Sequence, residues 1–250
     1  MNLGIEGKVA LVMGASRGIG RGIAAALARE GACVGISSRS ADALEEAAAA
    51  VEGEVRAFPA DTADLERMRS LPGEVVATLG PVEILVTNTG GPPSGSPLEN
   101  SPQEWEEAFR SLVLGPRTLI EAVLPGMRER GWGRIVNVSS SSIREPIPGL
   151  TLSNANRMAA LGLLKTLADE VAGDGITVNT VATGMFATER LADLHGSLEQ
   201  AEAAAKERIP AGRLGRPGEY GDLVAFLCSE RAAYLTGAVI PLDGGLLRSV

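Results

Sequence analysis

Short, nearly continuous apolar runs alternate along the chain with longer segments whose apolar residues recur at helical spacing. Continuous apolar runs predict strands buried on both faces, and the helical spacing predicts amphipathic helices. The runs place strands at 8–13, 32–37, 54–58, 82–87, 133–139, 175–181 and 236–241. The spacing places helices at 19–30, 41–51, 63–79, 102–130, 152–173 and 217–229. This alternation predicts an α/β fold, a doubly wound sheet of about seven parallel strands with helices on both faces.

The first strand runs directly into a glycine-rich turn and then a helix. Residues 8–20 read KVALVMGASRGIG, with glycines at Gly14, Gly18 and Gly20. Glycines let the backbone approach phosphates without a Cβ in the way, and the free N–H groups at a helix start stabilise negative charge. The arrangement predicts a diphosphate-binding turn. A tight strand-to-helix turn that binds nothing is the alternative.

Two further segments interrupt the alternation. The run from Pro92 to Pro97 follows a strand at the edge where parallel sheets place ligand loops, so we interpret it as part of a binding site. Residues 185–212 contain a mostly polar, alanine-rich helix, which we interpret as a lid over the substrate; a plain surface excursion is the alternative. No Ser/Gly-rich linker divides the chain, and we expect 1–250 to form a single dinucleotide-binding domain.

Charge and composition narrow the class of partner. The formal net charge of −8 argues against nucleic acid or an anionic membrane as a partner. The N-terminal segment lacks the features of a signal peptide and no run approaches the length of a membrane span, so we expect a cytoplasmic protein. Two cysteines inside predicted core elements and a single histidine lead us to expect buried free thiols and no metal site.

The end of the second predicted strand bears on the choice of cofactor. An acidic residue there would bind a ribose 2′-hydroxyl and repel a 2′-phosphate, but residues 36–40 read ISSRS. Ser38 and Arg39, with Arg17 in the glycine turn, offer hydroxyl and guanidinium groups that suit a 2′-phosphate. We therefore expect NADP(H) to be preferred over NAD(H); the alternative is that both arginines are solvated surface charges.

A series of motifs between residues 7 and 246 carries a family resemblance. They are GASRGIG (14–20), EILVTNTGG (83–91), GRIVNVSS (133–140), GITVNTVATG (175–184), RLGRPGE (213–219) and LTGAVIPLDGG (235–245). With them the chain resembles the short-chain dehydrogenase/reductase family, in particular its 3-oxoacyl-carrier-protein reductase-like branch. The resemblance implies a Rossmann-type sheet and a small-molecule or acyl-thioester substrate. It also implies a cofactor site made of Gly14, Ser16, Arg17, Gly18, Ile19, Gly20, Ser38, Arg39, Asp61, Thr62, Asn88, Gly90, Arg157, Gly184, Phe186 and Thr188.

The catalytic positions depart from the family pattern. The resemblance places the family serine on Ser140, but the tyrosine falls on Ser153, the lysine on Arg157 and the asparagine on Leu112. Ser153 and Arg157 are four residues apart and share a helix face. A serine hydroxyl lacks the acidity of a phenol and arginine stays protonated, so the pair keeps its geometry and loses its acidity. The catalytic candidates are Ser140, Ser153, Asn154 and Arg157, the last also as a contact to the nicotinamide ribose or an anionic substrate.

Three functions remain open at this stage. The first is NADPH-dependent reduction of a ketone, such as a 3-oxoacyl thioester, through an atypical site. The second is a catalytically degenerate dinucleotide-binding protein that acts as a sensor, scaffold or oligomer partner. The third is different chemistry in the same crevice, such as hydration or epimerisation, with Arg157 holding an anionic group. The tyrosines Tyr220 and Tyr234 lie far from the catalytic helix in sequence, and neither is an obvious substitute for the missing phenol.

Two apolar segments bear on assembly. The helix at 152–173 is apolar on more than one face, and the stretch 235–250 ends without a polar tail. Both would be costly to leave in water, so we expect a homotetramer or a homodimer, which the resemblance also implies. A monomer that buries both segments internally is the alternative.

Overall fold

The computed structural model describes residues 1–249 and is built around one seven-stranded parallel sheet. The strands run in the order β3-β2-β1-β4-β5-β6-β7. Their bounds are β1 Val9–Met13, β2 Cys33–Ser37, β3 Val55–Ala57, β4 Val82–Asn88, β5 Gly133–Val138, β6 Ile176–Thr183 and β7 Val239–Leu242. The doubly wound parallel sheet expected from the apolar runs is confirmed. Because β1 lies between β2 and β4, the winding reverses there, and such a reversal opens a crevice at the carboxyl ends of the strands.

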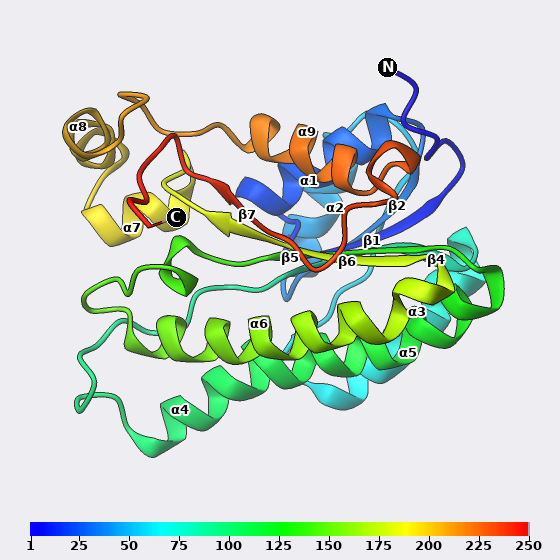
Figure 1. The fold of residues 1–250 in the computed structure, drawn as a ribbon, viewed down its shortest axis with the longest axis horizontal. Helices are drawn as coiled ribbons and strands as arrows, with labels where there is room; N and C mark the ends of the chain where they lie inside the picture. The colour runs from blue at the N-terminus through cyan, green and yellow to red at the C-terminus, as the bar shows by residue number, and fades with distance from the viewer. Residues whose placement is uncertain (250) are drawn as a thin grey trace.

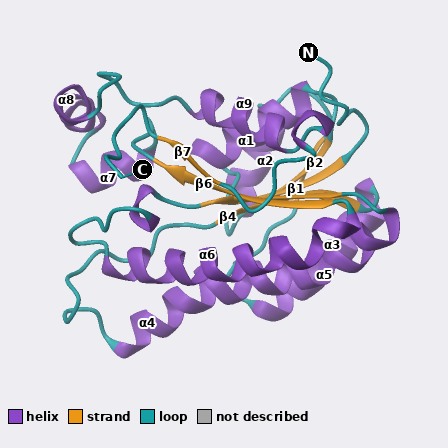
Figure 2. Cartoon of the chain, viewed as in Figure 1, coloured by secondary structure: helices purple, strands orange, loops and turns teal. Residues whose placement is uncertain are grey.

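Helices cover both faces of the sheet (Figures 1 and 2). One layer holds α1 Gly18–Arg29, α2 Ala41–Ala49 and α9 Pro217–Leu227. The other holds α3 Leu65–Leu79, α4 Pro102–Phe109, α5 Gly115–Arg130 and α6 Thr151–Val171. The short helices α7 Glu189–His195 and α8 Leu198–Arg208 lie beyond the sheet, near the C-terminus. In residues 1–249, no helix combines the length and apolarity that a membrane crossing needs.

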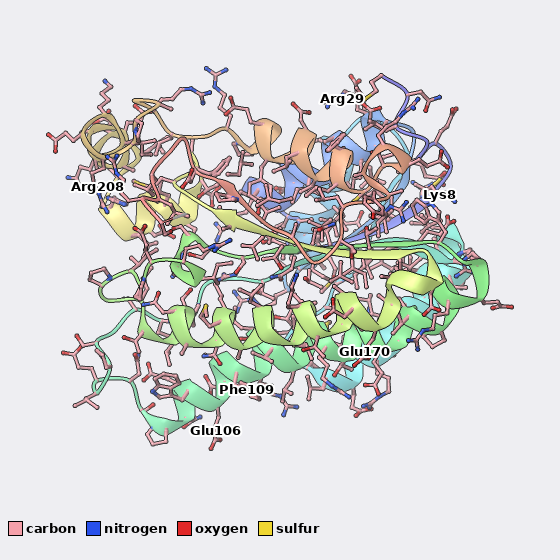
Figure 3. The ribbon with its side chains drawn as sticks, viewed as in Figure 1. Lys8, Arg29, Glu106, Phe109, Glu170 and Arg208 are labelled. Atoms are coloured by element: carbon pink, nitrogen blue, oxygen red, sulfur yellow. The ribbon has the colours of Figure 1, made fainter. Side chains whose placement is uncertain are left out.

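Each face of the sheet has its own hydrophobic core. Neighbouring strand residues point to opposite faces, so Leu11 and Val12 enter different cores, as do Leu85 and Val86. The first core joins these strands to α1, α2 and α9 through residues that include Ile23, Leu44 and Val224. The second joins them to α3, α5 and α6 through residues that include Met68, Leu119 and Leu164. Charged side chains such as Lys8, Arg29, Glu170 and Arg208 lie around the outside (Figure 3).

The helix expected at 102–130 is divided by a π turn at Arg110–Leu114. The Gly115 N–H donates to the carbonyl of Arg110, five residues back, and the following Pro116 has no N–H to offer the α-helical ladder. A Cβ on Gly115 would lie 2.0 Å from the carbonyl oxygen of Thr62. The glycine therefore permits close packing of this turn on the loop after β3, which the apolar spacing alone does not indicate.

Smaller differences lie in the thiols and in the segment 185–212. Cys228 is buried as expected, but Cys33 is only half-buried and its Sγ lies 3.3 Å from a carboxylate oxygen of Glu54. The segment 185–212 holds two helices, α7 and α8, where one was expected. Gly196, at φ +88°, separates the two helices.

Candidate functional site

The glycine turn after β1 has a backbone path that larger residues would block. Gly14 has a φ of +58°, and a Cβ there would lie 2.6 Å from the carbonyl oxygen of Asn88. A Cβ on Gly20 would lie 2.2 Å from the carbonyl oxygen of Gly14. The Asn88 amide donates to the Gly14 carbonyl at 3.1 Å and so ties the turn to the end of β4. Arg17, the N-cap of α1, makes no side-chain capping bond, so the helix start keeps N–H groups that suit a phosphate.

The end of β2 carries two hydroxyls that have no partner within residues 1–249. Ser37 Oγ and Ser38 Oγ are both buried and make no hydrogen bond there. Arg39 is exposed beside them, and its neighbours from 37 to 40 include no acid. Unpaired buried hydroxyls next to a cation and an open glycine turn have the chemistry of a site for a dinucleotide with a 2′-phosphate. The residues present therefore fit the cofactor that the sequence indicates.

Arg17 has an acidic partner within the chain. It forms an ion pair with Glu189 at the start of α7, and both side chains are more than half exposed. The structure therefore links the glycine turn to the segment 185–212 through this arginine. That Arg17 and Arg39 converge on a 2′-phosphate stays a prediction.

The other expected cofactor residues lie on the loops at the same edge of the sheet. Asp61 Oδ1 accepts the Ala63 N–H at 2.9 Å, which shapes the loop after β3. Phe186 is buried and stacks edge-on against Tyr220, with ring centroids 5.2 Å apart. Thr188 caps α7 through the Leu191 N–H, and its Cγ2 would lie 3.2 Å from a Cβ on Gly18. Ser16, Thr62, Gly90 and Gly184 lie in these loops, and Ile19 lies in the first turn of α1.

Ser153 and Arg157 form a hydrogen-bonded pair on the first turns of α6. Arg157 Nε donates to Ser153 Oγ at 3.1 Å, and Arg157 Nη1 donates to the carbonyl oxygen of Val138 at 3.1 Å. Val138 ends β5, so the arginine side chain spans the space between α6 and the sheet edge. Ser140 follows β5 and its Oγ accepts the Ser142 N–H at 3.1 Å. Both serine oxygens therefore accept a bond from the protein, which leaves each hydroxyl proton available to an outside acceptor.

The remaining catalytic candidate has a structural task. Asn154 donates its amide to the carbonyl oxygen of Ile147 at 2.9 Å and accepts the Ile147 N–H at 3.4 Å. Both ends of the side chain are committed to the loop that precedes α6. Asn154 therefore positions this loop, and its expected catalytic role stays a prediction. Asn156, one of the two asparagines at this helix start, is buried and donates to the Leu152 carbonyl at 2.8 Å.

The position of the family asparagine is apolar. Leu112 lies in the π turn, is 3% exposed, and belongs to a cluster with Ala108, Val113, Leu152 and Ala160. It packs the π turn against α6 and has no polar atom that could join a proton relay. The structure therefore has no replacement for that relay at this position.

Arg157 carries its charge in a poorly solvated place. Desolvation by burial, opposed by Tyr220 and aided by the positive charge of Arg190, lowers the pKa of its guanidinium to about 10. Arg190 projects from α7, and its Nη2 donates to the carbonyl oxygen of Pro92 at 3.1 Å. Sequence reasoning did not single out Arg190, because nothing local connects α7 to the loop after β4 or to α6.

Tyr220 also lies closer to the site than its sequence position indicates. It is fully buried in α9, and its hydroxyl lies 2.9 Å from Thr183 Oγ1 at the end of β6. Burial raises the pKa of the phenol above its usual range, while the positive charge of Arg157 lowers it. A buried phenol with a raised pKa is a poor acid, so Tyr220 does not replace the missing tyrosine. Thr183 supplies its hydrogen-bond partner.

The segment 185–212 packs against the C-terminal residues. An apolar cluster of Met185, Ala201, Ala205, Ile209 and Leu214 holds its two helices together, and Leu246 packs against the cluster. Glu145, in the loop after β5, accepts the N–H groups of Arg248 and Ser249 at 2.8 Å each. The C-terminal residues thus join this segment to the loop that carries Ser140.

Comparison with known proteins gives a consistent result over nearly the whole chain. Residues 14–247 match the family model described as enoyl-(acyl carrier protein) reductase. The 3-oxoacyl-(acyl carrier protein) reductase FabG of Thermotoga maritima is 34% identical over 246 residues, covering 97% of this chain and 99% of the relative. Human dehydrogenase/reductase SDR family member 4 is 36% identical over 245 residues, covering 96% and 88%.

A solved structure extends the likeness to three dimensions. The L-sorbose reductase of Gluconobacter frateurii, complexed with NADPH and L-sorbose, matches with a TM-score of 0.94 at 32% identity and covers 100% of both chains. The seven-stranded parallel sheet agrees with this likeness. The chain belongs to the short-chain dehydrogenase/reductase family.

Proposed function

We propose that the protein reduces a ketone with NADPH through a site made of Ser140, Ser153 and Arg157. The observation that carries the proposal is the hydrogen bond of 3.1 Å between Arg157 Nε and Ser153 Oγ, beside Ser140 at the carboxyl edge of the sheet. The pair keeps the spacing of the family's proton-donating pair. The reductases among the similar proteins support the same reaction class.

The proposed cofactor preference, NADP(H) over NAD(H), rests on the end of β2. The buried hydroxyl of Ser38 lacks a partner within residues 1–249, and Arg39 adds a guanidinium next to it. A 2′-phosphate would give both groups an anionic acceptor. Arg17 can join them where Glu189 releases it, because the ion pair between the two is exposed.

The chain's own residues bind the carbonyl and stabilise its charge. A bound NADPH supplies a hydride to the carbonyl carbon. The hydroxyls of Ser140 and Ser153 donate to the carbonyl oxygen, and the Arg157 cation, bonded to Ser153 Oγ, stabilises the negative charge that grows there. The proton of Ser153 Oγ then completes the alcohol, and water returns a proton to the serine. A serine is a weaker acid than a phenol, so we expect slow turnover.

The remaining features complete the proposal. The segment 185–212 acts as a lid, held to the glycine turn by the ion pair of Arg17 with Glu189.

The protein forms a homotetramer or homodimer, because large apolar side chains such as Phe109, Met158 and Tyr234 are 42%, 49% and 104% exposed. Light scattering at micromolar concentration checks the assembly, and a monomer would contradict it.

The reaction is tested by measuring NADPH binding by calorimetry and NADPH oxidation with a panel of ketones, in wild type and in Ser140→Ala and Ser153→Ala. We expect each variant to bind NADPH normally and to lose about a hundredfold in kcat, as for removal of one donor to a developing oxyanion. Ser70→Ala, on the exposed face of α3, is the matched control. Tight NADPH binding with no oxidation of any ketone would instead support the dinucleotide-binding protein without reductase activity.

A further inference from the structure

Two arginines on the loops and helices at the carboxyl ends of β4 and β5, Arg157 and Arg190, are held by backbone carbonyls and have no carboxylate partner within residues 1–249. Arg17, Arg29, Arg67, Arg128 and Arg213 each form an ion pair with an acid. Arg157 and Arg190 form none within residues 1–249, although the chain carries a net charge of −8. Arg157 is bonded at the end of β5 and Arg190 in the loop after the neighbouring strand β4, and the positive charge of Arg190 is close enough to lower the pKa of Arg157. Two cations held near each other without a neutralising acid would be stabilised by binding an anion from outside the chain.

The hydrogen bonds of the two guanidinium groups leave donors free. Arg157 uses Nε for Ser153 Oγ and Nη1 for the Val138 carbonyl, which leaves Nη2 without a partner among residues 1–249. Arg190 uses Nη2 for the Pro92 carbonyl and lies over the backbone of Gly91, where a Cβ would meet its guanidinium at 2.8 Å. These contacts hold both groups in place while part of each donor set stays open.

The acids on the surrounding loops are committed elsewhere. Glu189, next to Arg190 in the sequence, pairs with Arg17. Glu145 accepts two backbone N–H groups from the C-terminal residues, and Asp243 accepts those of Gly245 and Leu247. No carboxylate of residues 1–249 forms an ion pair with Arg157 or Arg190.

We infer that Arg157 and Arg190 form a subsite for a carboxylate of the substrate, so that the ketone reduced here is an oxo acid. The inference rests on the proposed function and names its substrate class. The subsite lies beside Ser140 and Ser153, where the carbonyl binds, and away from the glycine turn, where the cofactor diphosphate binds. The planar fork of a guanidinium matches the two oxygens of a carboxylate. Because Arg190 belongs to α7, the anion also draws the lid segment toward α6.

The test compares acetoacetate with its uncharged methyl ester, by calorimetric binding to the protein loaded with NADP⁺ and by NADPH oxidation. We expect wild type to bind acetoacetate at least about tenfold more tightly than the ester, as for one hydrogen-bonded charge pair. Arg190→Gln should remove this difference, and Arg190→Lys should restore part of it. Lys206→Gln, an equal charge change on α8 of the same segment, should leave the difference in place.

The outcomes separate this inference from the reductase proposal. Equal binding of acid and ester, or an equal loss in Lys206→Gln and Arg190→Gln, would overturn the carboxylate subsite. Oxidation of NADPH by the ester in that case would leave the reductase proposal standing. Binding of acetoacetate that depends on Arg190, without oxidation of any ketone, would support the subsite and contradict the reductase. Arg190 is exposed on a short helix, so its substitution leaves the fold intact.

Discussion

The glycine turn after β1 and the first turns of α6 lie at the same crevice, yet they depend on different properties of their residues. The turn depends on the absence of side chains, since a Cβ on Gly14 or Gly20 would meet backbone at 2.6 or 2.2 Å. The start of α6 depends on functional groups, and there the hydrogen-bonded spacing of Ser153 and Arg157 is kept while the acidity is not. The comparison teaches that a backbone shape and a proton donor are separable parts of one site.

The largest expected effect is the loss of NADPH binding when the backbone of the glycine turn is disturbed. Gly20→Ala places a methyl group 2.2 Å from the Gly14 carbonyl, so the turn must move and NADPH binding should be lost. The matched control is Gly162→Ala in α6, where nothing lies within 4 Å. It should raise the free energy of unfolding by about 0.5–1 kcal/mol, because alanine loses less chain entropy in a helix. Calorimetric titration with NADPH and thermal unfolding measure both; unaltered NADPH affinity in Gly20→Ala would contradict the account of the turn.

A smaller effect should separate the two cofactors. Arg39→Ala should weaken NADPH by roughly 1.5–3 kcal/mol, the range for a charged hydrogen bond, and leave NADH unaffected. Arg29→Ala at the far end of α1 removes an exposed arginine away from the crevice and serves as the control (Figure 3). Titration of both cofactors into each variant measures the difference. An equal loss of NADPH and NADH in Arg39→Ala would point to a disturbed fold and end the argument for the 2′-phosphate.

The next prediction concerns how kcat/KM depends on the protonation of Arg157 at the start of α6. The site works with Arg157 as a cation, and the pKa of that guanidinium is lowered to about 10. The protonated form exists below that pKa, so kcat/KM for a neutral ketone should stay level through neutral pH and fall as the pH rises through about 10. Cofactor binding and circular dichroism at the same pH values exclude loss of NADPH or of the fold. A decline centred near neutral pH would show that another group controls the reaction.

The smallest expected effect concerns the packing beneath the site. Tyr220→Phe removes the hydroxyl that lies 2.9 Å from Thr183 Oγ1, and should lower the free energy of unfolding by about 1 kcal/mol. Tyr234→Phe makes the same substitution at a fully exposed position and should change nothing. Chemical denaturation of the two variants measures the difference. A Tyr220→Phe protein as stable as wild type would remove the role given to this contact.

The sequence predicted the elements better than it predicted the contacts between them. All seven strands lie where continuous apolar runs place them, because burial on both faces of a sheet leaves a local signature. The glycine turn was likewise visible, since only glycine permits that path. The pairing of Arg17 with Glu189, of Thr183 with Tyr220, and the nearness of Arg157 to Arg190 were not visible. These contacts join residues far apart in the chain, and only the folded arrangement brings them together.

At Asn154 and Leu112 as well, the sequence does not show which contacts the side chain makes. An asparagine at a helix start offers a polar group for catalysis or for a local contact, and only the structure shows that its amide holds Ile147. Leu112 was identified as a departure from the family pattern, but its packing against α6 depends on the π turn. The π turn follows from Pro116 and Gly115 acting together, which apolar spacing does not record.

The central claim is that the site keeps the geometry of a reductase and lacks its acid. The most direct measurement is NADPH oxidation with an acetoacetyl thioester by wild type and by the double variant Ser153→Tyr/Arg157→Lys, with NADPH affinity measured in parallel. The account predicts weak or no oxidation by wild type and a gain of at least about tenfold in the double variant, toward the lower end of what a positioned acid contributes. Rapid wild-type turnover that falls in the double variant, with NADPH still bound, would contradict it.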